Sequence, residues 1–284
     1  GNDSISVGAE INYIYSGAGD DFISAGAGND VLEGGAGNDA FNDSFSARYH
    51  GAGMGSDTYY FGRGGGADVI FDYDATAGNL DIICYKAGIS PSDIALSRSS
   101  LAINDLVVSL KDTTDSIVIK SWFSAPSWRV EQVKFNDGTI WGVDVLQNAP
   151  IYGTASNDVI VLAAGDQMIF AGNGDDSVNA GAGNDVLSGG LGNDSFNDDS
   201  SARTGGASLG NDVYMFARGD GNDTIFEFDD SAGNKDVLEF TNAIASSQLW
   251  FEHSGNYLRV SVIGEADSVT IKNWYESSAA RIEQ

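Results

Sequence analysis

Residues 17–41 read GAGDDFISAGAGNDVLEGGAGNDAF and repeat a unit of nine residues. Each unit has a glycine-rich run, then an acidic residue, and a large apolar residue two positions after the acid. The three acid and apolar pairs are Asp21/Ile23, Asp30/Leu32 and Asp39/Phe41. The pattern is G-G-x-G-x-D-x-U-x, where U is large and apolar, and a short fixed period of this kind is typical of a solenoid. A flexible linker would not need an apolar residue after every acid.

A second, longer repeat shows that the chain is a tandem duplication. The register extends back to Asp3 and Asn12, and an offset of 155 residues maps the first copy onto the second. The mapped positions are Asp158, Gln167, Asp176, Asp185 and Asp194. After a three-residue deletion, Arg129–Gln132 still matches Arg281–Gln284. We therefore predict two domains, 1–149 and 150–284, the first truncated at its N-terminal end and the second at its C-terminal end.

Composition excludes several functional classes. The chain of 284 residues has 41 Asp and Glu against 14 Lys and Arg, a net charge of −27. This charge excludes a basic patch for nucleic acid or an anionic membrane. The single cysteine excludes a disulfide framework. No apolar run approaches the roughly 18 residues of a membrane span. A compact body with this charge repels itself unless cations neutralise its carboxylates.

The nonapeptide itself predicts local structure. Glycines at its first, second and fourth positions allow a tight turn with positive φ. The x-U-x half is a strand too short to be stable alone, and its inward U residue packs on the next one. Two nonapeptides then form one flattened coil, so turns that are two nonapeptides apart stack on one edge.

Stacked turns of this kind suit calcium, which takes 6–8 oxygen ligands from carboxylates and backbone carbonyls. We expect several ions per copy, with binding and folding as one event because the U residues alone bury little surface. The predicted carboxylate and amide ligands are Asp3, Asn12, Asp21, Asp30, Asp39, Asp57, Asp68, Asp81, Asp158, Asp176, Asp185, Asp194, Asp212, Asp223 and Asp236. The predicted carbonyl ligands are Gly17, Gly19, Gly26, Gly28, Gly35, Gly37, Gly172, Gly174, Gly181, Gly183, Gly190 and Gly192.

This spacing of two nonapeptides assigns the acids to two edges. Edge one is predicted to carry Asp3, Asp21, Asp39 and Asp57, and Asp158, Asp176, Asp194 and Asp212 in the second copy. Edge two is predicted to carry Asn12, Asp30 and Arg48, and Gln167, Asp185 and Arg203 in the second copy. We expect filled sites along edge one and a weaker site between Asn12 and Asp30. We expect no ion at either arginine, which would pair with Asp30 and Asp185 or with Asp68 and Asp223.

Beyond the regular repeats the spacing loosens. Gly64–Ile70 and Gly78–Ile83 still read as turn plus strand and should extend the roll, as should their equivalents in the second copy. Alternating strands at 106–110, 116–120, 133–135 and 140–141 are predicted to cap its open end. Asp72, Asp74, Asp229 and Asp230 are expected in solvated acidic loops. Trp122 and Trp274 are expected in the cap core, whereas Trp128 and Trp250 are candidates for an exposed ligand contact.

These motifs resemble the RTX (repeats-in-toxin) family of hemolysin-type calcium-binding proteins. The resemblance rests on the successive G-x-G-[ND]-D-x-[apolar] units. The later R-G-x-G-x-D-x-I, G-N-x-D and K-[SN]-W-[FY] sections resemble the hemolysin-type calcium-binding related domain. The resemblance implies an all-β chain of two tandem right-handed parallel β-rolls, each with a β-rich C-terminal cap. It also implies calcium ligation by the motif aspartates and glycine carbonyls, and folding outside the cell after export by a type I secretion apparatus.

The predicted function is that of a calcium-binding module in a secreted or bacterial cell-surface protein, either a toxin-like exoprotein or an adhesin. No H-E-x-x-H or G-x-S-x-G motif occurs, so we expect no enzyme in this chain. Two alternatives remain: a module that binds a cell-surface glycan or protein, and the non-catalytic tail of a secreted enzyme.

Overall fold

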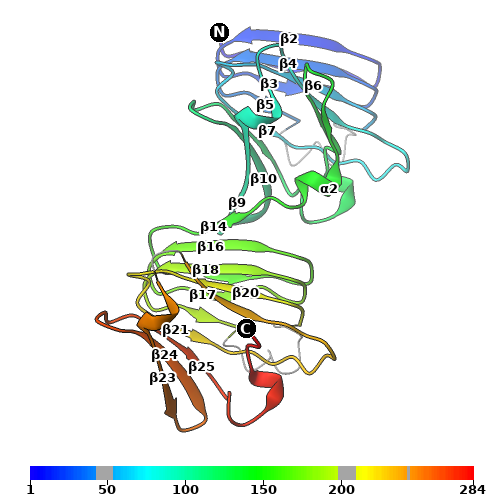
Figure 1. Ribbon diagram of the computed structural model, residues 1–284. Coiled ribbons are helices and arrows are strands. Elements are labelled where there is room, and N and C mark those ends of the chain that lie inside the picture. Colours follow the sequence, from blue (N-terminus) through cyan, green and yellow to red (C-terminus); the bar gives the residue numbers. More distant parts are fainter. Residues whose placement is uncertain (43–53, 198–208, 242–243) are drawn as a thin grey trace. The chain divides into compact units, whose positions relative to one another are not determined.

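The computed structural model describes residues 1–42, 54–197, 209–241 and 244–284 (Figure 1). Contacts between residues divide the chain into two compact units. Unit 1 comprises Gly1–Arg98 and Ala102–Ala149, and unit 2 comprises Ser99–Leu101 and Pro150–Gln284. Both units are built almost wholly of strands, as predicted.

Unit 1 is a roll of short strands that continues into a cap. The roll strands are β1 (Ser4–Ser6), β2 (Tyr13–Ala18), β3 (Phe22–Ser24), β4 (Val31–Ala36), β5 (Ala40–Phe41), β6 (Thr58–Phe61), β7 (Ala67–Ile70) and β8 (Ile82–Tyr85). The cap elements are β9 (Ile94–Ser99), β10 (Ala102–Leu110), β11 (Ser116–Ile119), β12 (Gln132–Lys134), β13 (Ile140–Trp141), the short helix α2 (Val143–Leu146) and the 3-10 turns η1 (Pro91–Asp93) and η2 (Pro126–Trp128).

Odd and even roll strands form opposite sheets. One sheet has the order β1-β3-β5-β7-β11-β10-β9, and the other has the order β13-β12-β8-β6-β4-β2. The roll strands pair in parallel, with Ile5 beside Ile23 and Tyr13 beside Val31. This register confirms the predicted coil of two nonapeptides.

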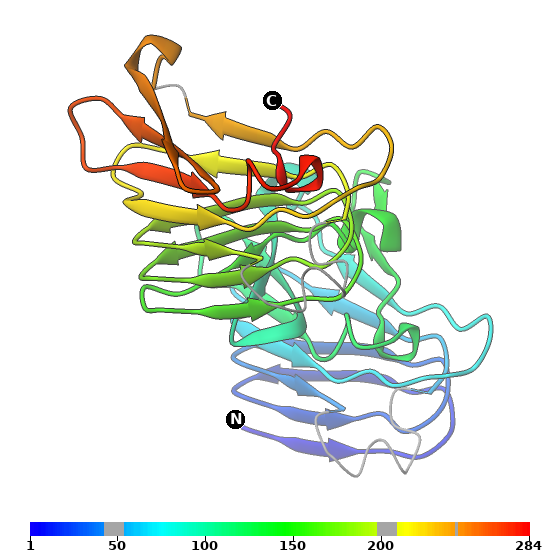
Figure 2. The same cartoon turned by 90° about the horizontal axis from the view of Figure 1, so that it is seen from below.

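Unit 2 repeats the arrangement. Its roll strands are β14 (Ile151–Tyr152), β15 (Val159–Val161), β16 (Met168–Asn173), β17 (Ser177–Asn179), β18 (Val186–Leu191), β19 (Ser195–Phe196), β20 (Val213–Phe216), β21 (Asn222–Ile225) and β22 (Val237–Phe240). Its cap holds β23 (Leu249–Ser254), β24 (Tyr257–Val262), β25 (Ser268–Ile271), η3 (Ser246–Gln248) and η4 (Ser278–Ala280). Figure 2 shows its short strands stacked as successive coils.

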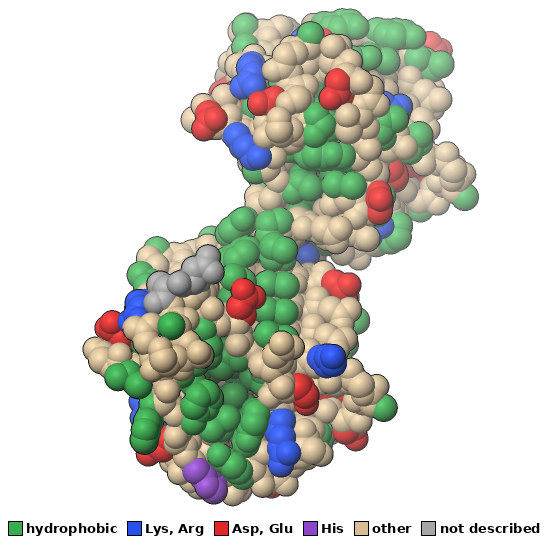
Figure 3. Space-filling model, in the orientation of Figure 1, with side chains coloured by type: hydrophobic (Ala, Val, Ile, Leu, Met, Phe, Trp, Pro, Cys, Tyr) green, Lys and Arg blue, Asp and Glu red, His purple; other side chains and the backbone are tan. Residues whose placement is uncertain are grey.

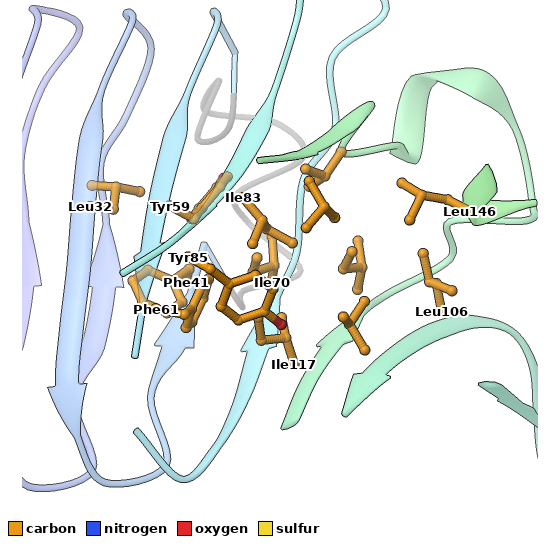
Figure 4. Close-up of a cluster of buried hydrophobic side chains, with 14 of the residues drawn as sticks. Leu32, Phe41, Tyr59, Phe61, Ile70, Ile83, Tyr85, Leu106, Ile117 and Leu146 are labelled. Atoms are coloured by element: carbon orange, nitrogen blue, oxygen red, sulfur yellow. The ribbon is translucent and has the colours of Figure 1, made fainter. Parts of the chain in front are cut away.

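The core is the stack of U residues between the two sheets. Ile23, Leu32 and Phe41 are fully buried, and the Phe41 ring meets Tyr59 edge-on at 5.6 Å between centroids. Figure 4 shows how this stack leads through Ile70 and Ile83 into the cap residues Leu106 and Leu146. Roll and cap therefore share one apolar core in unit 1.

One prediction about register is wrong. After Phe41 the coil is longer than two nonapeptides, because β6 pairs with β4 and β7 pairs with β5. The step from Asp30 to Asp57 is 27 residues, and the step from Asp39 to Asp68 is 29. Asp57 therefore lies on edge two and not on edge one, and Asp212 does the same in unit 2. Arg48 and Arg203, which were predicted on edge two, lie outside the described residues.

The burial of Trp122 agrees with the prediction, whereas the burial of Trp128 does not. Trp122 is fully buried in the cap, as predicted, and its indole N–H donates to the Val130 carbonyl at 2.9 Å. Trp128 is also buried, packed against Phe71 and Tyr73, so it is not an exposed contact. Trp250 on β23 is 63% exposed.

The stacking of coils explains why glycine is needed in the turns. Gly17 and Gly35 have φ of +109° and +108°, a region that costs other residues about 1–2 kcal/mol. A Cβ at Gly35 would also overlap the Gly17 carbonyl oxygen, whereas a Cβ at Gly17 would meet no atom within 4 Å. Alanine at either position would therefore strain the backbone, but only alanine at position 35 would also overlap the neighbouring coil.

We predict that Gly35→Ala destabilises the chain more than Gly17→Ala does. Both variants should lose about 1–2 kcal/mol from the left-handed backbone, and only Gly35→Ala should lose more through the forced separation of two coils. Urea unfolding in saturating calcium, followed by circular dichroism, measures the difference. Equal losses would contradict the close stacking of the turns.

Candidate metal sites

Edge one is a ladder of aspartates joined by hydrogen bonds between coils. The backbone N–H of Asp3 donates to Oδ1 of Asp21 at 2.7 Å, that of Asp21 to Asp39 at 2.9 Å, and that of Asp39 to Asp68 at 2.8 Å. In unit 2 the same bonds join Asp158, Asp176, Asp194 and Asp223, at 2.7, 2.8 and 3.0 Å. Each carboxylate is thereby fixed against the next coil.

Edge two is a second ladder with more carboxylates than predicted. Its rungs in unit 1 are Asn12, Asp30, Asp57 and Asp81, joined by bonds of 2.8, 2.8 and 2.7 Å. In unit 2 they are Gln167, Asp185, Asp212 and Asp236, joined by bonds of 2.7, 2.9 and 2.9 Å.

The cap provides the last rung of each edge-two ladder. The N–H of Asp81 donates to Oε2 of Glu131 at 2.7 Å, and that of Asp236 donates to Oε2 of Glu283 at 3.0 Å. Neither glutamate was among the predicted ligands. The sequence could have indicated them, because they occupy matching positions in Arg129–Gln132 and Arg281–Gln284 of the two copies.

The second oxygen of eight ladder carboxylates is the unusual feature. Among the described residues, eight Oδ2 atoms are buried without any hydrogen-bond partner. They belong to Asp21, Asp30, Asp39, Asp57, Asp176, Asp185, Asp194 and Asp212. A buried carboxylate oxygen without a donor is costly unless a cation or a proton neutralises it. For Asp39 and Asp194 this oxygen faces its own turn, since a Cβ at Gly34 or Gly189 would overlap it.

The glycines provide the rest of the environment. All twelve predicted glycines have positive φ, between +84° at Gly26 and +148° at Gly183. Without side chains, their carbonyls stay accessible beside the carboxylates. Asp3 and Asn12 are less enclosed, because they belong to the outermost coil described.

Electrostatics penalises the ladders when no cation is bound. Burial, and then the charge of the neighbouring Asp30, raises the pKa of Asp57 to about 7. Burial, and then Asp39, raises the pKa of Asp68 to about 7. In unit 2, burial and neighbouring aspartates raise the pKa values of Asp212 and Asp223 to about 8. At neutral pH the ladders therefore favour a cation or a proton.

The loop acids do not behave as predicted. Asp230 is exposed, but Asp72 and Asp229 are buried, and Asp74 is half-buried. Asp72 accepts a hydrogen bond from the Tyr59 hydroxyl at 3.0 Å, and Oδ2 of Asp74 accepts the Gly55 N–H at 2.9 Å. The solvated-loop prediction is therefore wrong for Asp72 and Asp229, because the loop folds inward against the last coil.

Comparisons with known families agree with this geometry. The model of the RTX calcium-binding nonapeptide repeat matches residues 6–41 and 163–196. The chain carries RTX calcium-binding repeats. The model of the haemolysin-type calcium binding protein related domain matches residues 105–145 and 258–284. Calcium is thus the cation for which the RTX turns are built, and the unpartnered buried oxygens fit a hard cation of this kind.

This RTX chain spans only part of the length of the known proteins to which it is similar. The iron-regulated protein FrpA of Neisseria meningitidis serogroup C is 32% identical over 75 residues, which is 25% of this chain and 7% of FrpA. The extracellular lipase LipA of Serratia marcescens aligns with 95% of this chain and 37% of its own, at 13% identity and a TM-score of 0.32. Among the described residues, no helix has the length and apolar character needed to cross a bilayer.

We predict that acid stabilises the calcium-free RTX rolls. The pKa of a ladder carboxyl such as that of Asp57 or Asp212 is about 7–8 in the folded chain and roughly 3.9 in the unfolded chain. Its protonation therefore stabilises the folded chain, and this stabilisation is complete at pH values below the unfolded pKa. That contribution is lost as the pH rises through 7–8. In calcium-free buffer, far-UV circular dichroism should therefore show a larger β-sheet signal at pH 5.5 than at pH 8.

In saturating calcium the trend should reverse, because protons compete with the ion for the same oxygens. Calcium-free circular dichroism and urea titrations in saturating calcium, each at both pH values, test this. A calcium-free β-sheet signal that falls on acidification would show that the ladder carboxylates carry no electrostatic penalty.

Proposed function

We propose that this chain is a calcium-dependent folding module of a secreted bacterial protein. The observation that carries the proposal is the set of eight buried Oδ2 atoms without hydrogen-bond partners. In these eight carboxylates one oxygen fixes the neighbouring coil, and the other remains for a cation. The fold thus creates a demand for positive charge at these rungs.

The proposed ligands follow the two ladders. On edge one, ions would lie between the turns of Asp3, Asp21, Asp39 and Asp68, and between those of Asp158, Asp176, Asp194 and Asp223. On edge two, they would lie between the turns of Asn12, Asp30, Asp57 and Asp81, and between those of Gln167, Asp185, Asp212 and Asp236. Carbonyls of the twelve glycines would complete the shells.

Binding and folding would then be one process. Without ions the stacked carboxylates repel each other, and each coil adds only two inward U residues to the core. With ions the same carboxylates hold neighbouring coils together. The free energy of binding therefore becomes free energy of folding, and each copy, 1–149 and 150–284, would act as one such module.

This coupling suits a protein that works outside the cell. Extracellular calcium sites bind at about 10⁻⁴–10⁻³ M, so the chain would stay unfolded in a low-calcium cytosol and fold after export. A type I secretion apparatus accepts such a chain. The parent protein would be a toxin-like exoprotein or an adhesin, in which this chain acts without catalysing a reaction itself.

We predict that Asp39→Asn raises the calcium midpoint of folding about tenfold. Asp39 faces two turns, and a contact with a charged group is worth about 1.5–3 kcal/mol. The matched control is Asp112→Asn, which removes the same charge from an exposed turn whose positive φ accepts asparagine.

Far-UV circular dichroism with calcium, and separately with magnesium, measures both midpoints. A wild-type chain already folded without calcium at pH 8 would sink the proposal. Equal midpoints for Asp39→Asn and Asp112→Asn would remove Asp39 from the ligand set.

A second candidate function, recognition of a surface glycan or protein, is favoured by one feature of unit 2. Trp250 and Phe251 on β23 are 63% and 60% exposed. Phe251 lines an apolar groove of about 250 Å³, and Trp250 lies on the opposite face of the strand. Figure 3 shows apolar side chains gathered over this part of unit 2. In unit 1, Val133 and Leu146 of the cap pack on the corresponding surface. The groove is apolar, so the flat indole face of Trp250 is the better candidate for a sugar contact.

We predict that Trp250→Ala lowers binding to any glycan ligand at least about tenfold without moving the calcium midpoint, because an exposed aromatic contributes to contact and not to the core. Glycan-array screening of the calcium-loaded chain, followed by titration calorimetry, measures the affinity. Equal affinity of both chains would exclude this surface.

A further inference from the structure

We propose that the last calcium site of edge two in unit 1 has three carboxylate ligands, Asp57, Asp72 and Asp81, and that Asp212, Glu227 and Asp236 form its counterpart in unit 2. The inference rests on the proposed calcium-coupled folding and extends it. Asp72 and Glu227 belong to no nonapeptide, so the ladder model alone assigns them no ion.

The geometry brings three carboxylates together out of contact with water. In each trio, one oxygen of every side chain lies within 4.8 Å of the others. All six side chains are at most 1% exposed. Three carboxylates can provide as many as six oxygens, which is the lower end of the calcium coordination range.

A second observation points to a ligand. Oδ1 of Asp57 accepts the Asp30 N–H, but its Oδ2 is buried without a hydrogen-bond partner. The same is true of Asp212, whose Oδ1 accepts the Asp185 N–H. Each trio therefore contains a fully buried carboxylate oxygen that lacks a donor.

The hydrogen bonds that the trio does receive come from neutral groups. The Tyr59 hydroxyl donates to Asp72 at 3.0 Å, and Asn79 donates to Oδ2 of Asp81 at 2.8 Å. The charges that act on Asp72 are those of Asp81, Asp57 and Glu131, all of the same sign. Neutral donors orient the carboxylates and leave their charge uncompensated.

The third carboxylate gives this site a structural role that the other ladder sites lack. Asp57 and Asp81 precede β6 and β8 in one sheet, whereas Asp72 follows β7 in the opposite sheet. An ion bound by all three would join the two sheets of the roll at the coil next to the cap. Its three carboxylates also exceed the two that a pair of stacked turns provides.

The two copies preserve the charge but not the length of this side chain. Glu227 replaces Asp72 and still accepts a hydrogen bond from the equivalent tyrosine, Tyr214, at 2.7 Å. A role in packing alone would not require an acid in a fully buried position. A neutral, protonated acid that merely accepts from tyrosine is the alternative to be tested.

The experiment compares Asp72→Asn, Glu227→Gln and the double variant with wild type in saturating calcium. Native mass spectrometry counts the bound ions, and calorimetry gives their affinities. We expect each single variant to lose one ion and the double variant to lose two. Asp72→Glu and Glu227→Asp, which exchange the two natural side chains, should keep the full count, and Asp112→Asn should match wild type.

Unchanged ion counts and affinities in all three variants, with calcium-coupled folding intact, would overturn this inference and leave the proposed function standing. A wild-type chain that folds without calcium at pH 8 would instead overturn the proposed function. If the neutral variants do not fold, a crystal structure of the wild-type chain grown in calcium decides. An ion about 2.3–2.6 Å from Asp72 supports the site, and its absence refutes it.

Discussion

The structure depends on how each ladder aspartate divides its two oxygens. One oxygen accepts a backbone N–H from the neighbouring coil, which fixes the spacing and register of the stack. In eight of these aspartates the other oxygen is buried without a donor, and in Asp39 and Asp194 it faces the turn. A neutral side chain at these positions would keep a hydrogen-bonded ladder but would remove the need for a cation. In the proposed function, the same contact that orders the coils would therefore make the fold depend on an ion.

This arrangement explains a net charge of −27 in a folded chain. Surface acids spread evenly would destabilise a compact body through mutual repulsion. Here many of the acids are buried in two lines along each unit, where cations bound as proposed would convert repulsion into attraction between coils. The apolar core can then stay thin, with one inward residue for each nonapeptide. The cap thickens it, through Trp122, Leu106 and Leu146 in unit 1.

The strict nine-residue period made much of the fold predictable from the sequence. The predictions failed where this period is interrupted, after Phe41. The nine-residue spacing predicted the buried Ile23, Leu32 and Phe41 and the positive φ of the turn glycines. Asp57 follows Asp39 by the length of two nonapeptides, so spacing alone placed it on edge one, although β6 pairs with β4 and moves it to edge two. Asp72 was misjudged for a related reason. Its burial arises from Tyr59, 13 residues upstream, and local polarity carries no signal of that contact.

The ladders also explain why roll and cap belong to one module. Each interior aspartate faces the turns on both sides, so an ion bound at one level orders a carboxylate for the next and binding should be cooperative. On edge two the last rung is Glu131 or Glu283, which only the cap provides. The three-carboxylate clusters lie at this same end of the roll, where the two sheets meet the cap. Order would therefore spread along the stack from the cap, because that end combines the three-carboxylate cluster, the apolar core of the cap and the closing hydrogen bond.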